Sequence, residues 1–268
     1  MRSVLRPTSA PGFAYLLVTA LIAGSLAGCA TPPPASDPDA LADYRQTNDP
    51  LEPTNRFLYR VSDALDVVIM RPIALLYRAA VPEPARTGMH NVLDNIGGPV
   101  RFANDVLQGQ PKRAGDTAAR FAINTTVGIG GIFDVAKMNG IPNHDSDFAL
   151  TLAYWGVPEG PFLFLPVIGP SSPRDAAGYG VDVAIDPFTW IGRPSHSFTL
   201  ESYSKTAANA VDQRSRLLDT IASVKKTALD PYATFRSLYR QNRASKLENL
   251  RSGNQATVPD LSISPTTQ

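Results

Sequence analysis

Residues 55–70 read NRFLYRVSDALDVVIM, and apolar side chains recur in them every three or four positions. This spacing is typical of one face of an amphipathic helix, formed here by Phe57, Leu58, Val61, Leu65, Val68 and Ile69. Pro72 is expected to interrupt the helix, because proline lacks a backbone donor and clashes with the preceding turn. Val81-Pro82 and Glu83-Pro84 then mark a clear break.

Helical patterns of similar length continue along the chain. They cover about residues 85–95, 100–108, 111–126, a short stretch ending at Asp186-Pro187, a long helix at 199–228, and a basic helix ending near Leu250. There is no internal repeat and little strand alternation. The sequence therefore predicts an all-α protein with one folded domain at 49–250 and a polar, disordered tail at 251–268.

The first 28 residues have the parts of an export signal. Arg2 and Arg6 precede an apolar stretch over 13–26, which is too short for a transmembrane helix of about 20 residues. Leu26-Ala27-Gly28-Cys29 looks like the lipobox of bacterial lipoproteins, which predicts cleavage after residue 28 and a diacylglyceryl group on Cys29. The alternative is an ordinary secretory signal with an incidental cysteine, but Cys29 is the only cysteine in the chain and stands where a lipobox requires it.

The segment that follows the cysteine is rich in Pro, Ala and Asp, so residues 29–48 are predicted to form a flexible tether. Ala30, rather than aspartate, follows Cys29, and by analogy with known lipoproteins this favours sorting to the outer membrane. A lone cysteine also excludes an internal disulfide.

Composition limits the possible partners. The whole chain has 25 basic and 24 acidic residues, and residues 1–28 contain two arginines and no acid, which leaves 23 basic residues after cleavage. Nucleic-acid binding has no electrostatic support in this balance. No segment after Cys29 is long and apolar enough to span a bilayer. The weakly charged apolar helix faces fit either helices lying in one leaflet or, more commonly, packing in a soluble core.

Two motifs invite a cofactor or metal interpretation. Gly128-Ile129-Gly130-Gly131 lacks the spacing of a dinucleotide or P-loop motif, so a bend or a close packing point is favoured. His144-Asp145-Ser146-Asp147 matches no common zinc or calcium pattern, so a polar loop is favoured. No metal site and no cofactor are predicted.

An enzyme is not predicted either. The chain has no G-x-S-x-G elbow for a lipase nucleophile, and Ser171 and Ser172 lie in Gly-Pro-Ser-Ser-Pro, which is turn chemistry. The basic run Arg236, Arg240, Arg243 and Lys246 could contact lipid phosphates or an acidic partner, although a solvated helix face is the commoner explanation.

An ordered set of short motifs resembles one family. The opening signature is Asp49-Pro50-Leu51-Glu52 with Asn55-Arg56. Further matches are Arg71-Pro72, Val81-Pro82, Pro84-Ala85-Arg86, Gly88, Leu107-Gln108-Gly109, Arg120-Phe121, Asn124, Gly128, Gly130-Gly131, Asp134-Val135-Ala136, Phe148, Thr151-Leu152, Tyr154-Trp155-Gly156-Val157, Gly160-Pro161, Arg174-Asp175, Gly178 and Asp230-Pro231-Tyr232. Over about residues 49–243 the chain resembles the MlaA (VacJ) phospholipid-transport lipoproteins. Phe162, where the family has tyrosine, is a conservative departure.

The resemblance implies a ring-like domain of short amphipathic helices with a long C-terminal helix, seated in the inner leaflet of the outer membrane beside a porin trimer. It implies removal of mislocalised phospholipids from the outer leaflet through an amphipathic channel, with transfer to a soluble periplasmic carrier, MlaC. Asn55 and Arg56 are then expected to fix the first helix, and Gly128, Gly130 and Gly131 to shape a bend near the channel. No channel-lining residue is assigned. A lipoprotein that only scaffolds a porin, and a phospholipase, are the competing hypotheses.

Overall fold

The computed structural model describes residues 33–34, 36–190 and 200–253. The predicted signal peptide, Cys29 and most of the predicted tail therefore lie outside the described residues. The first helices are α2 (Pro38–Thr47), α3 (Glu52–Leu65), the π-helix η1 (Asp66–Met70), α4 (Arg71–Ala80), α5 (Glu83–Ile96), α6 (Gly98–Leu107), α7 (Pro111–Thr126), α8 (Val135–Met138) and α9 (Phe148–Tyr154). Strands β1 (Leu163–Leu165) and β2 (Gly169–Ser171) follow, and then α10 (Pro173–Ile185), α11 (Pro187–Trp190), α12 (Leu200–Arg216), α13 (Leu218–Thr227) and α14 (Pro231–Arg251).

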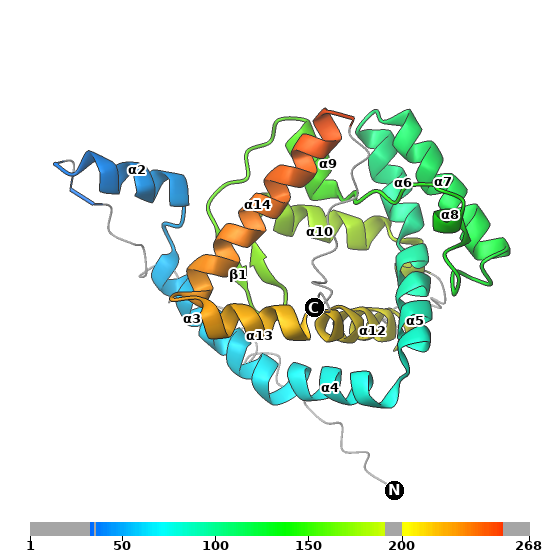
Figure 1. Ribbon diagram of the computed structural model, residues 1–268. Helices are drawn as coiled ribbons and strands as arrows, with labels where there is room; N and C mark the ends of the chain where they lie inside the picture. Colours follow the sequence, from blue (N-terminus) through cyan, green and yellow to red (C-terminus); the bar gives the residue numbers. More distant parts are fainter. Residues whose placement is uncertain (1–32, 35, 191–199, 254–268) are drawn as a thin grey trace, which may run out of the picture.

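The helices are arranged as a ring (Figure 1). Helices α3 to α7, then α9 and α14, follow one another around it, and α12 and α13 lie across its lower part in that view. Within the ring α6 packs against α7, α9 against α10, and α12 against α4 and α5. The predicted all-α class with a long C-terminal helix is confirmed, since α14 has 21 residues and the single sheet in the described part has two short strands.

Prolines set many of the helix starts. Eight of the described helices begin with proline in the first or second position, where its missing N–H costs no intrahelical bond: α2, α3, α5, α6, α7, α10, α11 and α14. Helix α4 also has proline in its second position, but it continues η1 without a break. Where a side chain caps the start, it is an oxygen acceptor. Asp147, Ser172 and Asp230 accept from the backbone N–H groups of Leu150, Asp175 and Ala233.

The expected interruption at Pro72 is wrong. Helix α3, η1 and α4 continue from residue 52 to residue 80, and the five residues before α4 form a π-helical turn. The N–H of Arg71 bonds to the carbonyl oxygen of Asp66, five residues earlier. One wider turn accommodates the proline ring without ending the helix.

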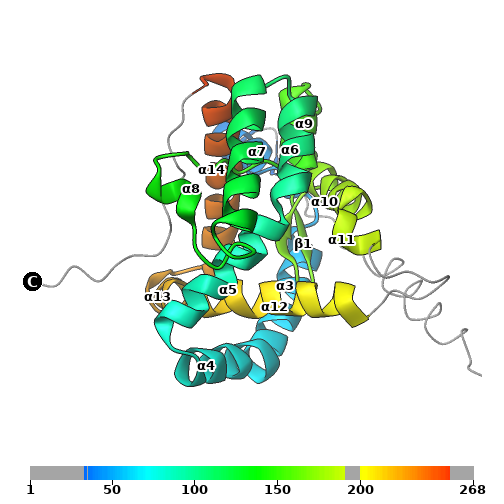
Figure 2. The same ribbon diagram turned by 90° about the vertical axis from the view of Figure 1, so that its right-hand side faces the viewer.

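The predicted single helix at 199–228 is also wrong, since it divides into α12 and α13 at Leu217. Figure 2 shows α12 lying across the view while α13 points along it, so the chain changes direction there. The break follows from packing rather than from a local breaker. Leu218 and Ser215 on either side of it are buried, and no glycine or proline lies between residues 200 and 230.

Part of the predicted flexible tether is helical. Pro38 opens α2, and Ala40, Leu41 and Ala42 have high helix propensity. At the end of α2, the carbonyl oxygen of Thr47 accepts a 2.6 Å hydrogen bond from Arg240 of α14. This contact attaches the end of the segment to the ring.

The compact core lies where the two ends of the domain meet. Phe162, Phe164 and Tyr232 are buried together, with Leu58, Tyr59 and Tyr239 packed around them. The antiparallel β1–β2 pair places Phe164 opposite Pro170 and packs against α3. The rings of Phe162 and Tyr232 meet edge to face with centroids 6.0 Å apart. Aromatic packing therefore joins the first helix, the hairpin and the last helix.

Candidate functional site

The outer side of the α3–η1–α4 helix carries an apolar band. We define the apolar band as Leu65, Val67, Val68, Ile69, Ile73, Leu75 and Leu76, all of which are exposed. Val68 is 73% exposed and Leu76 69%, whereas Ala74 is the only buried residue of α4. Soluble monomers rarely expose contiguous apolar surface of this kind. The soluble-core explanation for these helix faces is therefore wrong for this segment.

Pro72 and the π-helical turn keep the apolar band continuous. A break at Pro72 would have separated Val67, Val68 and Ile69 from the residues of α4. Because the helix continues instead, the band spans 12 residues from Leu65 to Leu76. The span contains two charged residues, the exposed Arg71 and the half-buried Asp66, which pairs with Arg214. A helix that is apolar around most of its exposed circumference is suited to a lipid environment.

The glycine-rich segment after α7 is a tight reversal. A Cβ atom on Gly128 would lie 2.5 Å from the carbonyl oxygen of Asn124, and one on Gly131 would lie 2.7 Å from Cβ of Asn95. Gly130 has φ +69° and Gly131 has φ +97°, conformations that disfavour other residues. A close packing point and bend is thus what these glycines form. Exposed apolar residues surround it, namely Val127, Ile129, Ile132, Phe133 and Met138.

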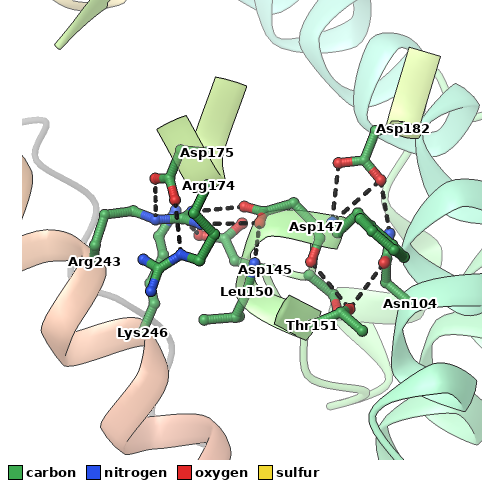
Figure 3. Close-up of polar contacts among 12 residues, drawn as sticks. Asn104, Asp145, Asp147, Leu150, Thr151, Arg174, Asp175, Asp182, Arg243 and Lys246 are labelled. Atoms are coloured by element: carbon green, nitrogen blue, oxygen red, sulfur yellow. Dashed lines mark hydrogen bonds and ion pairs between the residues drawn. The ribbon is translucent and has the colours of Figure 1, made fainter. Parts of the chain in front are cut away.

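A set of ion-paired and hydrogen-bonded side chains, which we call the polar belt, binds α14 to the rest of the ring (Figure 3). Arg243 donates to both carboxylate oxygens of Asp147, at 2.7 and 3.0 Å, and its Nε lies 2.8 Å from Asp175. Lys246 lies 3.0 Å from Asp145. Burial disfavours the charged form of Asp147, but Arg243 outweighs this and holds the pKa of the carboxyl below its usual range. The pair fixes α14 against the N-terminus of α9.

The expectation of a solvated basic face on α14 is wrong. Arg236 makes a 2.7 Å ion pair with Asp49, and Arg240 bonds to Thr47 and lies 3.9 Å from Glu159. Together with Arg243 and Lys246, all four predicted basic residues point to partners within the chain. Their partners lie far away in the sequence, outside α14, which is why the pattern of α14 alone could not reveal them.

A second part of the belt lies between α6, α9 and α10 and was missed by the sequence reasoning. Asp182 accepts from the backbone N–H of Phe148 at 3.0 Å and from Nδ2 of Asn104 at 2.8 Å. Thr151 donates to Asn104 at 2.9 Å. Burial raises the pKa of Asp182, because these two neutral donors and the distant Arg243 do not outweigh the loss of solvent. The sequence signal for this part of the belt was the recurrence of polar residues on helix faces that are otherwise apolar.

The opening signature residues lie in the buried core region. Asn55 donates to Asp49 at 2.8 Å and to the carbonyl oxygen of Phe162 at 2.9 Å, and it accepts from the N–H of Phe164 at 2.9 Å. Asp49 also accepts from the hydroxyl of Tyr232. Burial first, and then this hydrogen bond, raises the pKa of Tyr232. Asn55 thus joins the start of α3 to the β hairpin.

The remaining signature residues frame the same junction. Arg56 donates to Asp230 at 2.6 Å and to Glu52 at 2.7 Å, which links α3 to the start of α14. Pro50 and Leu51 immediately precede α3. Arg174 donates to the carbonyl oxygen of Val157, and Asp175 accepts from the hydroxyl of Tyr239 at 2.7 Å. The structure brings four of the predicted signature residues together: Asp49, Glu52, Asn55 and Arg56. It places Arg174 and Asp175 in the polar belt. The three signature glycines, Gly128, Gly130 and Gly131, lie apart from both groups, in the turn after α7.

The histidine and serine motifs have local roles. His144 is buried and lies 3.0 Å from Asp116, while His90 lies 2.8 Å from the buried Asp212. Within the described residues no group of three or more histidine, cysteine or acidic side chains could hold a metal ion. Ser171 ends β2 and Ser172 caps α10, rather than forming only a turn.

No helix among the described ranges has the length and hydropathy needed to span a bilayer. The exposed apolar band and the polar belt therefore belong to a ring of helices without a transmembrane segment in the described part of the chain.

Comparisons with known proteins identify the family. The model of the MlaA lipoprotein family matches residues 47–246. The intermembrane phospholipid transport system lipoprotein MlaA of Haemophilus influenzae is 33% identical over 239 residues, covering 87% of this chain and 90% of that protein. Its namesake in Escherichia coli K12 is also 33% identical, covering 84% and 86%. A solved structure, from work on the structural basis for maintenance of bacterial outer membrane lipid asymmetry, superposes with a TM-score of 0.66 at 31% identity, over 74% of this chain and 98% of that one. The chain therefore belongs to the MlaA lipoprotein family.

Proposed function

We propose that this chain is an outer-membrane lipoprotein that removes mislocalised phospholipids from the outer leaflet and passes them to a soluble periplasmic carrier. The observation that carries the proposal is the exposed apolar band on the rim of a helical ring whose last helix is held by ion pairs within the chain. Its relatives named for intermembrane phospholipid transport support the same role.

The arrangement suits the task physically. A phospholipid has a charged head group and two apolar tails, so a protein that moves it must offer a surface to each. An apolar rim lets the ring sit among acyl chains of one leaflet, on the periplasmic side, without a spanning helix. In this proposal the tails meet the apolar band, and the head group meets polar side chains of the ring.

Anchoring at Cys29 is part of the proposal. Each buried CH₂ group contributes about 0.8 kcal/mol to membrane binding, so two or three acyl chains on Cys29 would hold the protein on the membrane essentially permanently. Residues 1–28 act as the signal peptide and the segment 29–48 connects the anchor to the ring, attached at its end through Thr47. A porin trimer beside the ring is the proposed membrane partner.

The deciding experiment compares surface phospholipid in a deletion strain complemented with different alleles. Wild-type protein should restore outer-leaflet asymmetry. Leu76→Asp places a charge on the apolar band and should fail to restore it, whereas Gln241→Asp on the exposed side of α14 is a matched control that should succeed. Normal asymmetry in the uncomplemented deletion strain would refute the transport function. Porin co-purification without any lipid phenotype would favour a scaffold, and fatty-acid release by the purified protein would favour a phospholipase.

A further inference from the structure

The tip of the β hairpin has an unusual backbone conformation. Val167 has φ +71°, and Val167 and Ile168 are 78% and 57% exposed. Positive φ is rare outside glycine, asparagine and aspartate, and for a β-branched residue it is a genuine outlier because Cβ crowds the backbone. Glycine and asparagine are the residues that usually occupy such turn positions.

The fold itself gains little from a valine at this position. The side chain projects from the turn between β1 and β2, and more than three quarters of the residue's surface is exposed, so packing within the chain does not compensate for the strained backbone. Strain of this kind is typical of positions where a side chain serves something outside the fold. The five residues of the tip, Leu165 to Gly169, also include no charged or hydrogen-bonding side chain.

The hairpin tip lies beside the apolar band. The backbone N–H of Val167 donates to the hydroxyl of Ser62 on α3 at 3.3 Å. The residue three positions after Ser62 shares its helix face, and this residue is Leu65, an exposed member of the apolar band at the end of α3. Val167 and Ile168 therefore extend the band from the helix onto the hairpin.

We propose that the tip formed by Val167 and Ile168 is a second lipid-contact element, which inserts among phospholipid acyl chains together with the apolar band. This inference rests on the proposed function, since it requires the band to face lipid. An apolar, uncharged tip that continues a lipid-facing surface is matched by acyl chains. The partner is thus hydrocarbon rather than a phosphate or a charged peptide.

Depth-dependent quenching tests the proposal on the full-length acylated protein. Acylation occupies the thiol of Cys29, so a cysteine introduced by Val167→Cys can be labelled selectively with a fluorophore. The labelled protein is reconstituted in phosphatidylethanolamine–phosphatidylglycerol vesicles whose acyl chains are brominated. Leu76→Cys serves as the reference within the apolar band, and Ser245→Cys, at an exposed polar position of α14, serves as the matched control.

The labels at 167 and 76 should both be quenched and blue-shifted, and the label at 245 should not. Quenching at 76 without quenching at 167 would overturn this inference and leave the proposed function intact. Failure of quenching at both positions would refute the lipid-facing band as well. A label at 167 that ignores brominated lipid but is shielded by a purified periplasmic carrier would assign the tip to a protein partner, which also overturns the inference.

A second variant separates strain from lipid contact. Val167→Asn should raise the melting temperature in detergent by about 3 °C, because asparagine tolerates this conformation and relieves strain. The same change should reduce the quenching of a label at Ile168→Cys, since it places a polar group in the tip. An unchanged melting temperature together with unchanged quenching at 168 would overturn the proposal.

Discussion

Replacing Asn55 by alanine should be among the most destabilising single changes in the ring. Asn55 is 2% exposed and makes three hydrogen bonds, to Asp49, Phe162 and Phe164. Each bond contributes about 1 kcal/mol net, and the N–H of Phe164, left buried and unpaired, adds about 1 kcal/mol or more. The expected loss in the free energy of unfolding is about 4 kcal/mol. In a domain of this size 1 kcal/mol shifts the melting temperature by about 2–4 °C, so Asn55→Ala should melt roughly 10 °C lower.

The assay is thermal unfolding followed by far-UV circular dichroism, whose signal reports the helix content of the chain. Asn139→Ala is the matched control, because Asn139 also bonds a backbone carbonyl, that of Val135 at 2.8 Å, but is exposed. It should change stability by no more than about 0.5 kcal/mol. A loss for Asn55→Ala that is no larger than the loss for the control would refute the assignment of Asn55 as the link between the first helix and the hairpin.

Three further changes test other parts of the structure. Gly128→Ala should lower the free energy of unfolding by about 1–3 kcal/mol, because its Cβ would collide with backbone carbonyl oxygens. Gly115→Ala, in open space on α7, should instead raise it by about 0.5–1 kcal/mol. Thermal unfolding of the two variants beside the wild-type chain checks both. The pKa of Asp147 is depressed in the folded chain because Arg243 outweighs its burial, so its contribution to stability is present above about pH 4 and is lost as the pH falls through the folded pKa. Asp147→Asn should therefore flatten acid unfolding below about pH 4, and an unchanged acid transition would contradict the pairing. Leu76→Asp should leave the melting temperature in detergent nearly unchanged yet weaken flotation of the unacylated protein with vesicles, and equal flotation would show that the apolar band does not contact lipid.

Local backbone chemistry explains which parts of the fold could be predicted from the sequence. The start of α7 at Pro111 and the breaks at Val81-Pro82, Asp186-Pro187 and Asp230-Pro231 were predicted, because the preference of proline for helix starts acts within one turn. Pro72 was mispredicted, since a π-helical turn offers a second way to accommodate it. The division at Leu217 has no local signal and arises from how Ser215 and Leu218 are buried.

The candidate site was predictable only in outline. Helical periodicity identified an apolar face on residues 55–70, but the same pattern fits a soluble core and a lipid-facing surface, so exposure had to come from the structure. The ion pairs of α14 depend on acids such as Asp49 and Asp147, which approach it only in the folded chain. Asp182 and Asn104 are 78 residues apart and were found only through their contact.

The internal pairing of α14 has a consequence for how the protein meets a membrane. Arg236, Arg243 and Lys246 each have an acidic partner in the chain, so this helix presents little unbalanced charge to its surroundings. Long-range attraction to anionic surfaces is screened within about 8 Å at physiological ionic strength, and here that attraction would be weak even in dilute salt. Arrival at the membrane should therefore depend little on ionic strength or on the proportion of anionic lipid. A ring with this charge distribution can therefore work in envelopes that differ in surface charge without changes to its own charged residues.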